Sequence, residues 1–250
     1  MKRLVTSLLF LFSITLCFGQ EKTEILTFAF LADTHIGSGT SVEDLTKCVN
    51  DINSQPFIQF AILAGDITEF GSDDELAKAK EVLGLLNVPY YIIPGNHDTK
   101  WSESGCNTFN RIFGASRFSF TSHEMLFIGS NSGPNMRMGN AQVPREELVW
   151  LDSLVKATHK ETPIVYFVHN PMDNSLSNWD QVLDILCQGN IILSMGGHWH
   201  SNTFLMTDGV PTVLGRAVIA GGRGTGYNIV TIDPNSRQFQ ILGRMAGVQT

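Results

Sequence analysis

Residues 24–35 read EILTFAFLADTH, and the architecture of the whole chain depends on this pattern. The first eight residues form a short apolar run rich in aromatic and β-branched side chains, which predicts a buried β-strand. Asp33 and His35 follow directly after that strand. The same order, an apolar strand and then a polar cluster, recurs along the chain. It predicts an α/β fold with its chemistry at the strand ends.

Apolar runs alternate with amphipathic helical patterns along most of the chain. Ser72 and Glu75 have the spacing of a capping box, and Pro89 stops the helix that follows. Pro144 suits the first turn of another helix. There is no repeat or linker, so residues 20–250 are expected to form one domain of mixed α/β type. The predicted strands are 24–31, 57–63, 88–93, 125–128, 164–168, 191–194, 204–206, 210–214, 227–232 and 238–242, and the predicted helices are 41–52, 72–86, 144–155 and 179–187.

Composition narrows the class of protein. The chain has 250 residues, of which 43% are hydrophobic and only 16% charged. This length and hydrophobicity support a sizeable core and exclude disorder as the main state. The formal net charge of −7 argues against binding to long nucleic acids or to anionic membrane surfaces. Any phosphate-bearing ligand would therefore need local cations or metal ions, whereas the oligomeric state stays open.

The N-terminus has the pattern of a secretory signal peptide over residues 1–19. Lys2 and Arg3 precede a charge-free apolar run, and small residues stand before a cut ahead of Gln20. A membrane anchor is the competing interpretation, but the run is at the short edge of spanning length. A lipoprotein acylated at Cys17 is less well supported, because a bulky leucine precedes that cysteine. An exported protein, periplasmic or secreted, is expected.

Polar clusters at the ends of five predicted strands are the candidate functional residues. The carboxyl ends of strands in an α/β sheet are where ligands bind. Two residues at i and i+2 in extended backbone point to the same side, so each Asp-x-His or His-x-His pair is expected to aim two ligand atoms into one pocket. The clusters are Asp33-Thr34-His35, Gly65-Asp66, Gly95-Asn96-His97-Asp98, His169-Asn170 and Gly197-His198-Trp199-His200.

The chemistry of this set indicates metal ions. Taken singly, a histidine is more often a packed residue and an aspartate a helix cap. Together, four imidazoles, two carboxylates and an amide would be costly to bury without cations. Oxygen and imidazole ligands without thiolates suit Mn, Fe or Zn, and seven ligands exceed the needs of one ion. Two ions that share one bridging carboxylate are expected.

The ordered series Asp33-x-His35, Gly65-Asp66, Gly95-Asn96-His97-Asp98, His169 and Gly197-His198-x-His200 resembles the calcineurin-like metallophosphoesterases. The resemblance extends over nearly the whole chain after the signal peptide. It implies a four-layer α/β/β/α sandwich with a dinuclear metal centre at the strand ends. The two ions would be divalent or of mixed valence.

The resemblance also implies a role for each residue. It places Asp33, His35 and His200 on the first metal ion, Asn96, His169 and His198 on the second, and Asp66 between the two. Two close cations would convert a bridging water to hydroxide, which attacks the phosphorus. His97 would protonate the leaving group, with Asp98 as a candidate to hold its ring. The alternative for Asp98 is a turn residue that bonds the backbone.

The resemblance implies hydrolysis of a small phosphodiester or phosphomonoester. Purple acid phosphatases have a tyrosine where this chain has Glu69 and lack the histidine of the first motif, so a ferric phosphatase is not expected. One alternative is a catalytically silent, metal-stabilised binding module, and another is a nuclease of the same superfamily. Retention of His97, which holds no metal, argues against the first, and the absence of a basic stripe argues against the second.

Side chains outside the motifs are weaker candidates for substrate contacts. A cation can bind a phosphate or leaving group, and an aromatic ring can stack on a base or sugar. For each of them an ordinary surface or packing role is the alternative. These candidates are Lys100, Arg111, Arg216, Arg223, Trp101, Trp199 and Tyr227.

Overall fold

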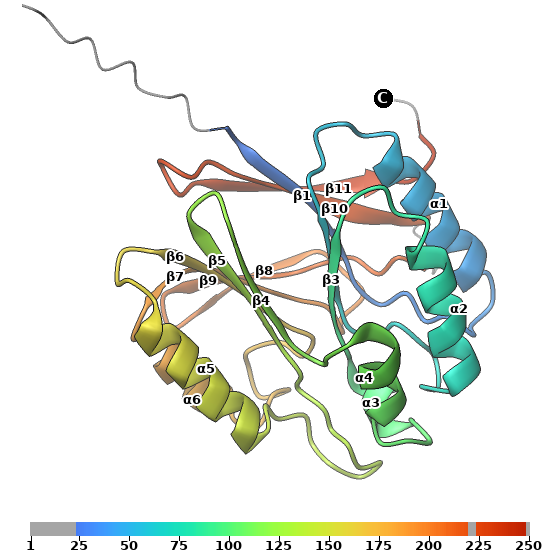
Figure 1. The fold of residues 1–250 in the computed structure, drawn as a ribbon, viewed down its shortest axis with the longest axis horizontal. Helices are drawn as coiled ribbons and strands as arrows, with labels where there is room; N and C mark the ends of the chain where they lie inside the picture. Colours follow the sequence, from blue (N-terminus) through green and yellow to red (C-terminus); the bar gives the residue numbers. More distant parts are fainter. Residues whose placement is uncertain (1–23, 220–223, 249–250) are drawn as a thin grey trace, which may run out of the picture.

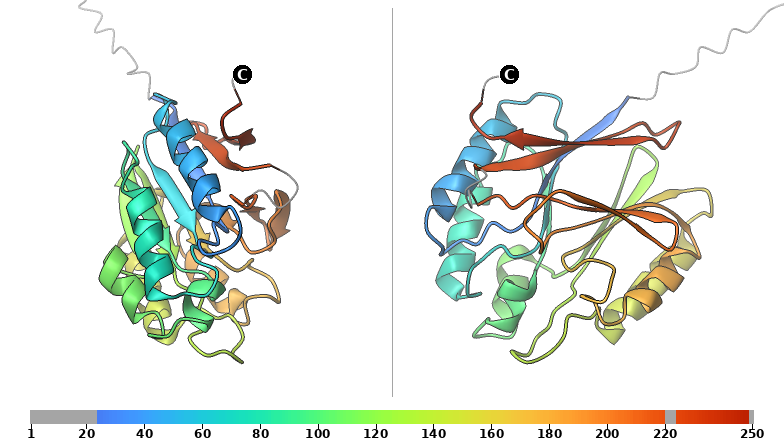
Figure 2. Two further views of the ribbon diagram at one scale, coloured as in Figure 1. Left: turned by 90° about the vertical axis from the view of Figure 1, so that its right-hand side faces the viewer. Right: turned by 180° about the vertical axis from the view of Figure 1, so that it is seen from behind.

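The fold is a sandwich of two mixed β-sheets between two layers of helices (Figure 1). The computed structural model describes residues 24–219 and 224–248. The predicted signal peptide, residues 1–19, lies outside the described residues. Seen from the side and from behind, the two sheets lie face to face and the helices cover the outer faces (Figure 2). This confirms the expected four-layer α/β/β/α architecture.

The first sheet has the strand order β11-β10-β1-β2-β3. Strands β1, β2 and β3 run parallel to one another, and β10 runs antiparallel to both of its neighbours, β1 and β11. Its strands are β1 (Leu26–Leu31), β2 (Ala61–Ala64), β3 (Tyr90–Ile93), β10 (Gly226–Ile232) and β11 (Phe239–Met245).

The second sheet has the strand order β4-β5-β6-β7-β9-β8. Strands β5, β6, β7 and β9 are parallel, and antiparallel strands β4 and β8 close the two edges. Its strands are β4 (Phe118–Ser122), β5 (Met125–Ser130), β6 (Pro163–Val168), β7 (Asn190–Gly196), β8 (Thr203–Thr207) and β9 (Val210–Leu214).

Within residues 24–219 and 224–248, six helices connect the strands. The capping box is confirmed at the start of α2, where the Glu75 backbone N–H donates to Ser72 Oγ (3.3 Å) and the Ser72 N–H donates to Glu75 Oε2 (3.1 Å). In the described residues the helices are α1 (Ser41–Asn53), α2 (Asp73–Leu83), α3 (Asn96–Lys100), α4 (Asn107–Phe113), α5 (Arg145–Ala157) and α6 (Trp179–Leu186).

Each sheet has apolar side chains on both faces, and strand β1 shows the reason in the first sheet. Phe28 and Phe30 point into the layer between the two sheets, whereas Ala29 and Leu31 point into the layer beneath α1 and α2. A third apolar layer lies between the second sheet and helices α5 and α6. Because successive side chains of a strand face opposite ways, a strand buried on both faces is apolar throughout, as residues 26–31 are.

Four elements differ from the sequence-based expectations. The strand predicted at 57–63 begins only at Ala61, because residues 54–58 form a turn in which the Ile58 N–H donates to the Gln55 carbonyl (3.1 Å). Strand β4, whose side chains are only partly buried, was not predicted. The short helices α3 and α4 were not predicted either, since five and seven residues are too few to show helical periodicity.

Candidate metal centre

The predicted functional residues meet at one edge of the sandwich, where strands β1, β2, β3, β6 and β7 end. Backbone hydrogen bonds join the loops that carry them: the Asp33 N–H donates to the Gly65 carbonyl, and the His35 N–H donates to the Asp66 carbonyl, each at 3.0 Å. The Gly197 N–H donates to the His169 carbonyl (3.0 Å) and so links the loops after β6 and β7. The ligand-bearing loops therefore form one connected surface.

The loop backbone differs from the expected extended conformation. Asp33, His35, Asp66, His198 and His200 all have positive φ, with values of 56°, 44°, 49°, 73° and 55°. Left-handed backbone is unfavourable for residues other than glycine, and it gathers at functional sites where the surrounding structure enforces it. The argument from extended i, i+2 spacing was therefore wrong. The side chains converge because tight left-handed turns direct them inward.

Asp33, His35 and His200 form the first candidate metal-binding group. The two imidazole Nε2 atoms of His35 and His200 lie 3.2 Å apart, and His200 Nε2 lies 3.5 Å from Asp33 Oδ1. The Asp33 carboxylate also accepts the His198 backbone N–H (3.1 Å to each oxygen). This places together the three residues that the resemblance assigned to the first ion.

Asp66, His169 and His198 form the second group. His169 Nε2 lies 3.2 Å from Asp66 Oδ2 and 3.1 Å from the side-chain oxygen of Asn96. Asp66 Oδ2 is also 4.0 Å from His35 Nε2 in the first group. A carboxylate oxygen that faces both groups has the position expected of a bridging ligand.

The buried carboxylates at this edge need cations to balance their charge. Asp33 and Asp66 are buried, with 0% and 2% of their surfaces exposed. Among the described residues, neither carboxylate forms an ion pair with lysine or arginine, and the ion-pair contacts that they make are with imidazoles. Burial raises the pKa of Asp33 to about 7, and Asp66 adds to the rise. Burial acts against ionisation of His169, but nearby Asp66 raises the pKa of its imidazole to about 9. The donor set fits two ions that prefer nitrogen and oxygen ligands.

In His35 and His169 the Nδ1 atom has a hydrogen-bond partner, so the Nε2 atom of each ring is directed toward the candidate metal-binding groups. His169 Nδ1 donates to the Ala64 carbonyl (2.8 Å), and His35 Nδ1 lies 2.8 Å from Glu69 Oε2. A bond of this kind fixes the tautomer, so that the Nε2 lone pair of each ring faces the metal-binding group. Sequence reasoning used Glu69 only to exclude one branch of the resembled superfamily. Its place three residues after Asp66 was visible, but nothing local showed which side chain it supports.

His97 lies beside the first group but is held differently from the ligands. Its ring packs edge-on against His35 with 4.7 Å between ring centroids, and its Nδ1 lies 2.6 Å from the Glu69 carbonyl oxygen. His35, Glu69 and His97 also lie close enough together to hold an ion. The hydrogen bonds of Glu69 to both rings account for this cluster without one.

Asp98 has a structural role in place of the expected one. It is fully buried, and its carboxylate accepts the N–H groups of Ile67 (3.0 Å), Thr68 (2.8 Å) and Gly95 (2.8 Å) and the Thr68 hydroxyl (2.6 Å). Burial raises the pKa of Asp98 to about 6, and Asp66 adds to the rise. The expectation that Asp98 holds the His97 ring was wrong, because the carbonyl of Glu69 occupies that position. Asp98 instead ties the loop after β2 to the loop after β3.

Of the candidate substrate contacts outside the motifs, some lie on the surface or in the core and others lie near the site. Arg111 pairs with Asp73 (3.2 Å) on the surface, and the buried Tyr227 hydroxyl donates to Asp51 (2.8 Å). The Arg216 guanidinium donates to the Gly224 carbonyl, and Arg223 lies outside the described residues. Trp199 is exposed beside His200 in the loop after β7, and Trp101 is exposed directly after α3, the helix that carries His97.

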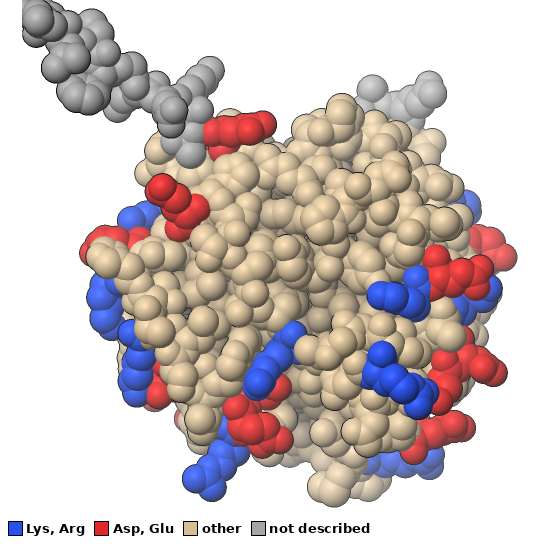
Figure 3. Space-filling model, in the orientation of Figure 1, with Lys and Arg blue, Asp and Glu red and all other residues tan. Residues whose placement is uncertain are grey.

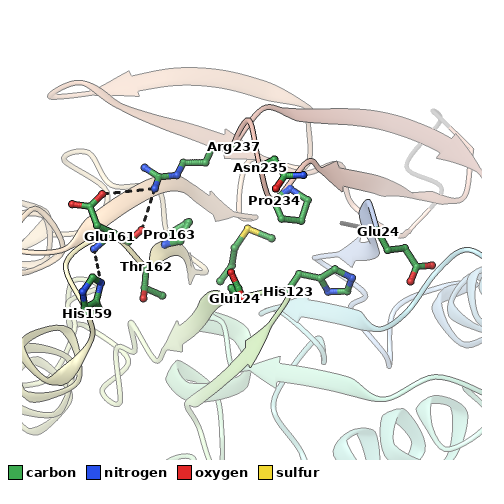
Figure 4. Close-up of a pocket in the computed structure, with 11 residues that line it drawn as sticks. Glu24, His123, Glu124, His159, Glu161, Thr162, Pro163, Pro234, Asn235 and Arg237 are labelled. Carbon is green, nitrogen blue, oxygen red and sulfur yellow. Dashed lines mark hydrogen bonds and ion pairs between the residues drawn. The ribbon is translucent and has the colours of Figure 1, made fainter. Parts of the chain in front are cut away.

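A roomy pocket at the opposite end of the sandwich is not the candidate site. Its volume is about 920 Å³, and His123, His159, Glu161 and Arg237 are among the residues that line it (Figure 4). These side chains come from turns that precede or connect strands, far from the carboxyl ends of β1 and β6. None of the candidate metal-binding groups found in residues 24–219 and 224–248 includes a residue of this pocket.

Comparison with known proteins agrees with a metal centre at this edge of the sandwich. Residues 26–202 match the calcineurin-like phosphoesterases. The chain is 26% identical over 197 residues to a probable glycerophosphodiester phosphodiesterase of Arcobacter nitrofigilis, which covers 68% of this chain and 70% of that protein. It is 23% identical over 167 residues to a glycerophosphodiester phosphodiesterase of Enterobacter lignolyticus, covering 58% and 57% of the two chains.

Solved structures of low sequence identity share the fold. GAP50, the anchor in the inner membrane complex of Plasmodium, aligns with a TM-score of 0.55 at 12% identity over 90% of both chains. A phosphatase from Mycoplasma pneumoniae aligns with a TM-score of 0.50 at 14% identity over 89% of this chain and 94% of that one. Within the part of the chain that the structure describes, every helix is too short or too polar to cross a membrane.

Proposed function

The chain belongs to the calcineurin-like phosphoesterase family, and from this premise we propose that it is a metal-dependent hydrolase of a small phosphodiester or phosphomonoester. The observation that carries the proposal is the pair of ligand groups that face the same Asp66 oxygen. Two relatives named as phosphodiesterases favour a diester as the substrate.

The proposed first ion is held by Asp33, His35 and His200, and the second by Asn96, His169 and His198, with Asp66 shared. Two ions bound there, whether Mn, Fe or Zn, would neutralise the phosphate oxygens and activate the attacking water. The chain's own contribution is the orientation of the ligands. Glu69 and the Ala64 carbonyl keep the Nε2 atoms of His35 and His169 turned inward.

We assign the leaving-group proton to His97 Nε2. Because Nδ1 donates to the Glu69 carbonyl, Nε2 is the ring atom that remains for proton transfer. After Nε2 has given up its proton, the ring is a neutral tautomer that still donates from Nδ1. The hydrogen bond to Glu69 therefore stabilises the ring both before and after the transfer.

The most direct test is a substrate screen of the purified protein with and without added Mn²⁺. We expect hydrolysis of bis-p-nitrophenyl phosphate that chelators abolish and Mn²⁺ restores, and elemental analysis should find two ions per chain. Metal binding without hydrolysis of any phosphodiester, phosphomonoester or nucleotide would instead identify a silent binding module. Rapid cleavage of polymeric DNA would identify a nuclease. The face seen in Figure 3 disfavours a nuclease, because its cations are interspersed with acidic side chains and form no stripe.

A further inference from the structure

A cluster of one indole and two cations lies next to the proposed catalytic histidine. Lys100 Nζ lies 5.5 Å from the centroid of the Trp101 ring, and the Arg137 guanidinium carbon lies 5.6 Å from it. Both distances are within the range of a cation–π contact. We call these three residues the Trp101 cluster.

The Trp101 cluster borders the leaving-group side of the site. Trp101 follows directly after the last residue of α3, still in helical conformation, so it lies one turn from His97 on the same helix face. Arg137 comes from the loop after β5, which is attached to the same edge of the sandwich because the Ser132 hydroxyl donates to the Asn170 side chain beside His169 (2.9 Å). Two loops from different sheets therefore meet over one indole beside His97.

The charges of the Trp101 cluster are unbalanced. Among the described residues, neither Lys100 nor Arg137 forms an ion pair with a carboxylate. Some other surface cations do have such a partner, as Arg111 has in Asp73. Two like charges gathered at one ring repel each other, and an anion between them would relieve that repulsion. The Arg137 side chain is exposed and 39% of Trp101 is exposed, so a ligand can reach them.

We propose that the Trp101 cluster is a subsite that selects a leaving group with a second anionic oxygen group. The body of the leaving group packs on the indole, and its anion contacts Lys100 and Arg137. This inference rests on the proposed function, because His97 defines which side of the site receives the leaving group. Guanidinium and ammonium groups bind carboxylate and phosphate oxygens through charge-assisted hydrogen bonds.

The test compares two substrates that differ only in charge, methyl 3-carboxyphenyl phosphate and methyl 3-carbamoylphenyl phosphate. Their phenolic leaving groups have the same size and similar acidity. We expect the wild type to prefer the carboxylate by roughly tenfold in kcat/KM, the effect typical of a hydrogen bond to a charged group. Arg137→Gln should reduce that preference to about threefold, and Lys100→Gln with Arg137→Gln should abolish it. High salt should weaken it in the wild type. Arg111→Gln, which removes a cation already paired with Asp73, should retain the preference and serves as the matched control.

Two results would overturn the subsite. One is equal kcat/KM of the wild type for the two substrates. If Trp101→Leu then slows both substrates equally, the indole binds the leaving group without help from the cations. The other is a tenfold preference that survives the double substitution. If neither diester is hydrolysed with Mn²⁺ present, the substrate screen described above decides the proposed function, and calorimetry decides the subsite separately. About tenfold tighter binding of 3-carboxyphenyl phosphate than of 3-carbamoylphenyl phosphate, lost in Arg137→Gln, would support the subsite, and equal binding would refute it.

Discussion

Replacement of Asp98 by asparagine separates a structural role from a catalytic one. The Asp98 carboxylate accepts four hydrogen bonds in a fully buried position, two at each oxygen. Asparagine keeps one acceptor oxygen and puts an NH₂ group in place of the other, so two buried donors lose their acceptor. Each such loss costs about 1–3 kcal/mol, so the free energy of unfolding should fall by about 2–6 kcal/mol.

The assay is thermal unfolding in the presence of a chelator at pH 8, where the carboxylate of the wild type is ionised. For a chain of this size, the expected loss lowers Tm by about 4–24 °C. Asp233→Asn is the matched control. Asp233 is partly exposed and accepts the N–H groups of Asn235 (2.9 Å) and Ser236 (3.3 Å) at one oxygen, which asparagine retains. Its stability should change by less than about 0.5 kcal/mol.

The reasoning would be refuted if Asp98→Asn unfolded within 1 °C of the wild type and yet turned over substrate about a hundredfold more slowly. That result would mean that Asp98 acts on the His97 ring after all. A large fall in Tm with a moderate fall in activity, recovered on cooling, is the outcome expected of a residue that ties two loops together.

Four further predictions follow from the geometry and the sequence. Glu69→Gln should weaken binding of the first metal ion by about 10–100-fold in chelator competition, because it removes the carboxylate that contacts the outer nitrogen of the His35 imidazole. Glu75→Gln, which changes a capping residue in the first turn of α2, should not weaken it. His97→Ala should leave two ions bound and slow turnover by roughly a hundredfold for an alkoxide leaving group and by much less for p-nitrophenolate; a rate ratio that is the same for all leaving groups would contradict the acid role. Burial raises the pKa of Glu147 from 4.5 to about 7, so its ionisation opposes folding progressively between those pH values. Glu147→Gln should remove up to about 3 kcal/mol of that pH-dependent loss, measured as a flatter profile of Tm against pH. Finally, we propose that the protein is exported, and N-terminal sequencing of the native protein should find it to begin at Gln20; an intact Met1 would refute this.

The patterns that predicted the fold involve residues that are close together in the sequence. The run at residues 24–31, the capping box of Ser72 and Glu75 and the polar clusters after the strands all depend on spacings of a few residues. The metal-ligand candidates were visible for the same reason, because each one follows a strand. The short helix α3 and the weakly patterned strand β4 had no such signal.

The sequence by itself determined most of the strand-and-helix order and the residue types at the strand ends. Through a resemblance to a family, it also suggested how the ligands are divided between two ions. Only the tertiary structure decided how those residues are held. Three of these features join positions about 30 or more residues apart: the contact between Glu69 and His35, the hydrogen bonds of Asp98 to the loop after β2, and the approach of Arg137 to Trp101. The fourth, the left-handed turns, depends on the loops packed around them. Spacing along the chain reports periodicity and caps, whereas hydrogen-bond partners across loops are set by where the two sheets place the strand ends.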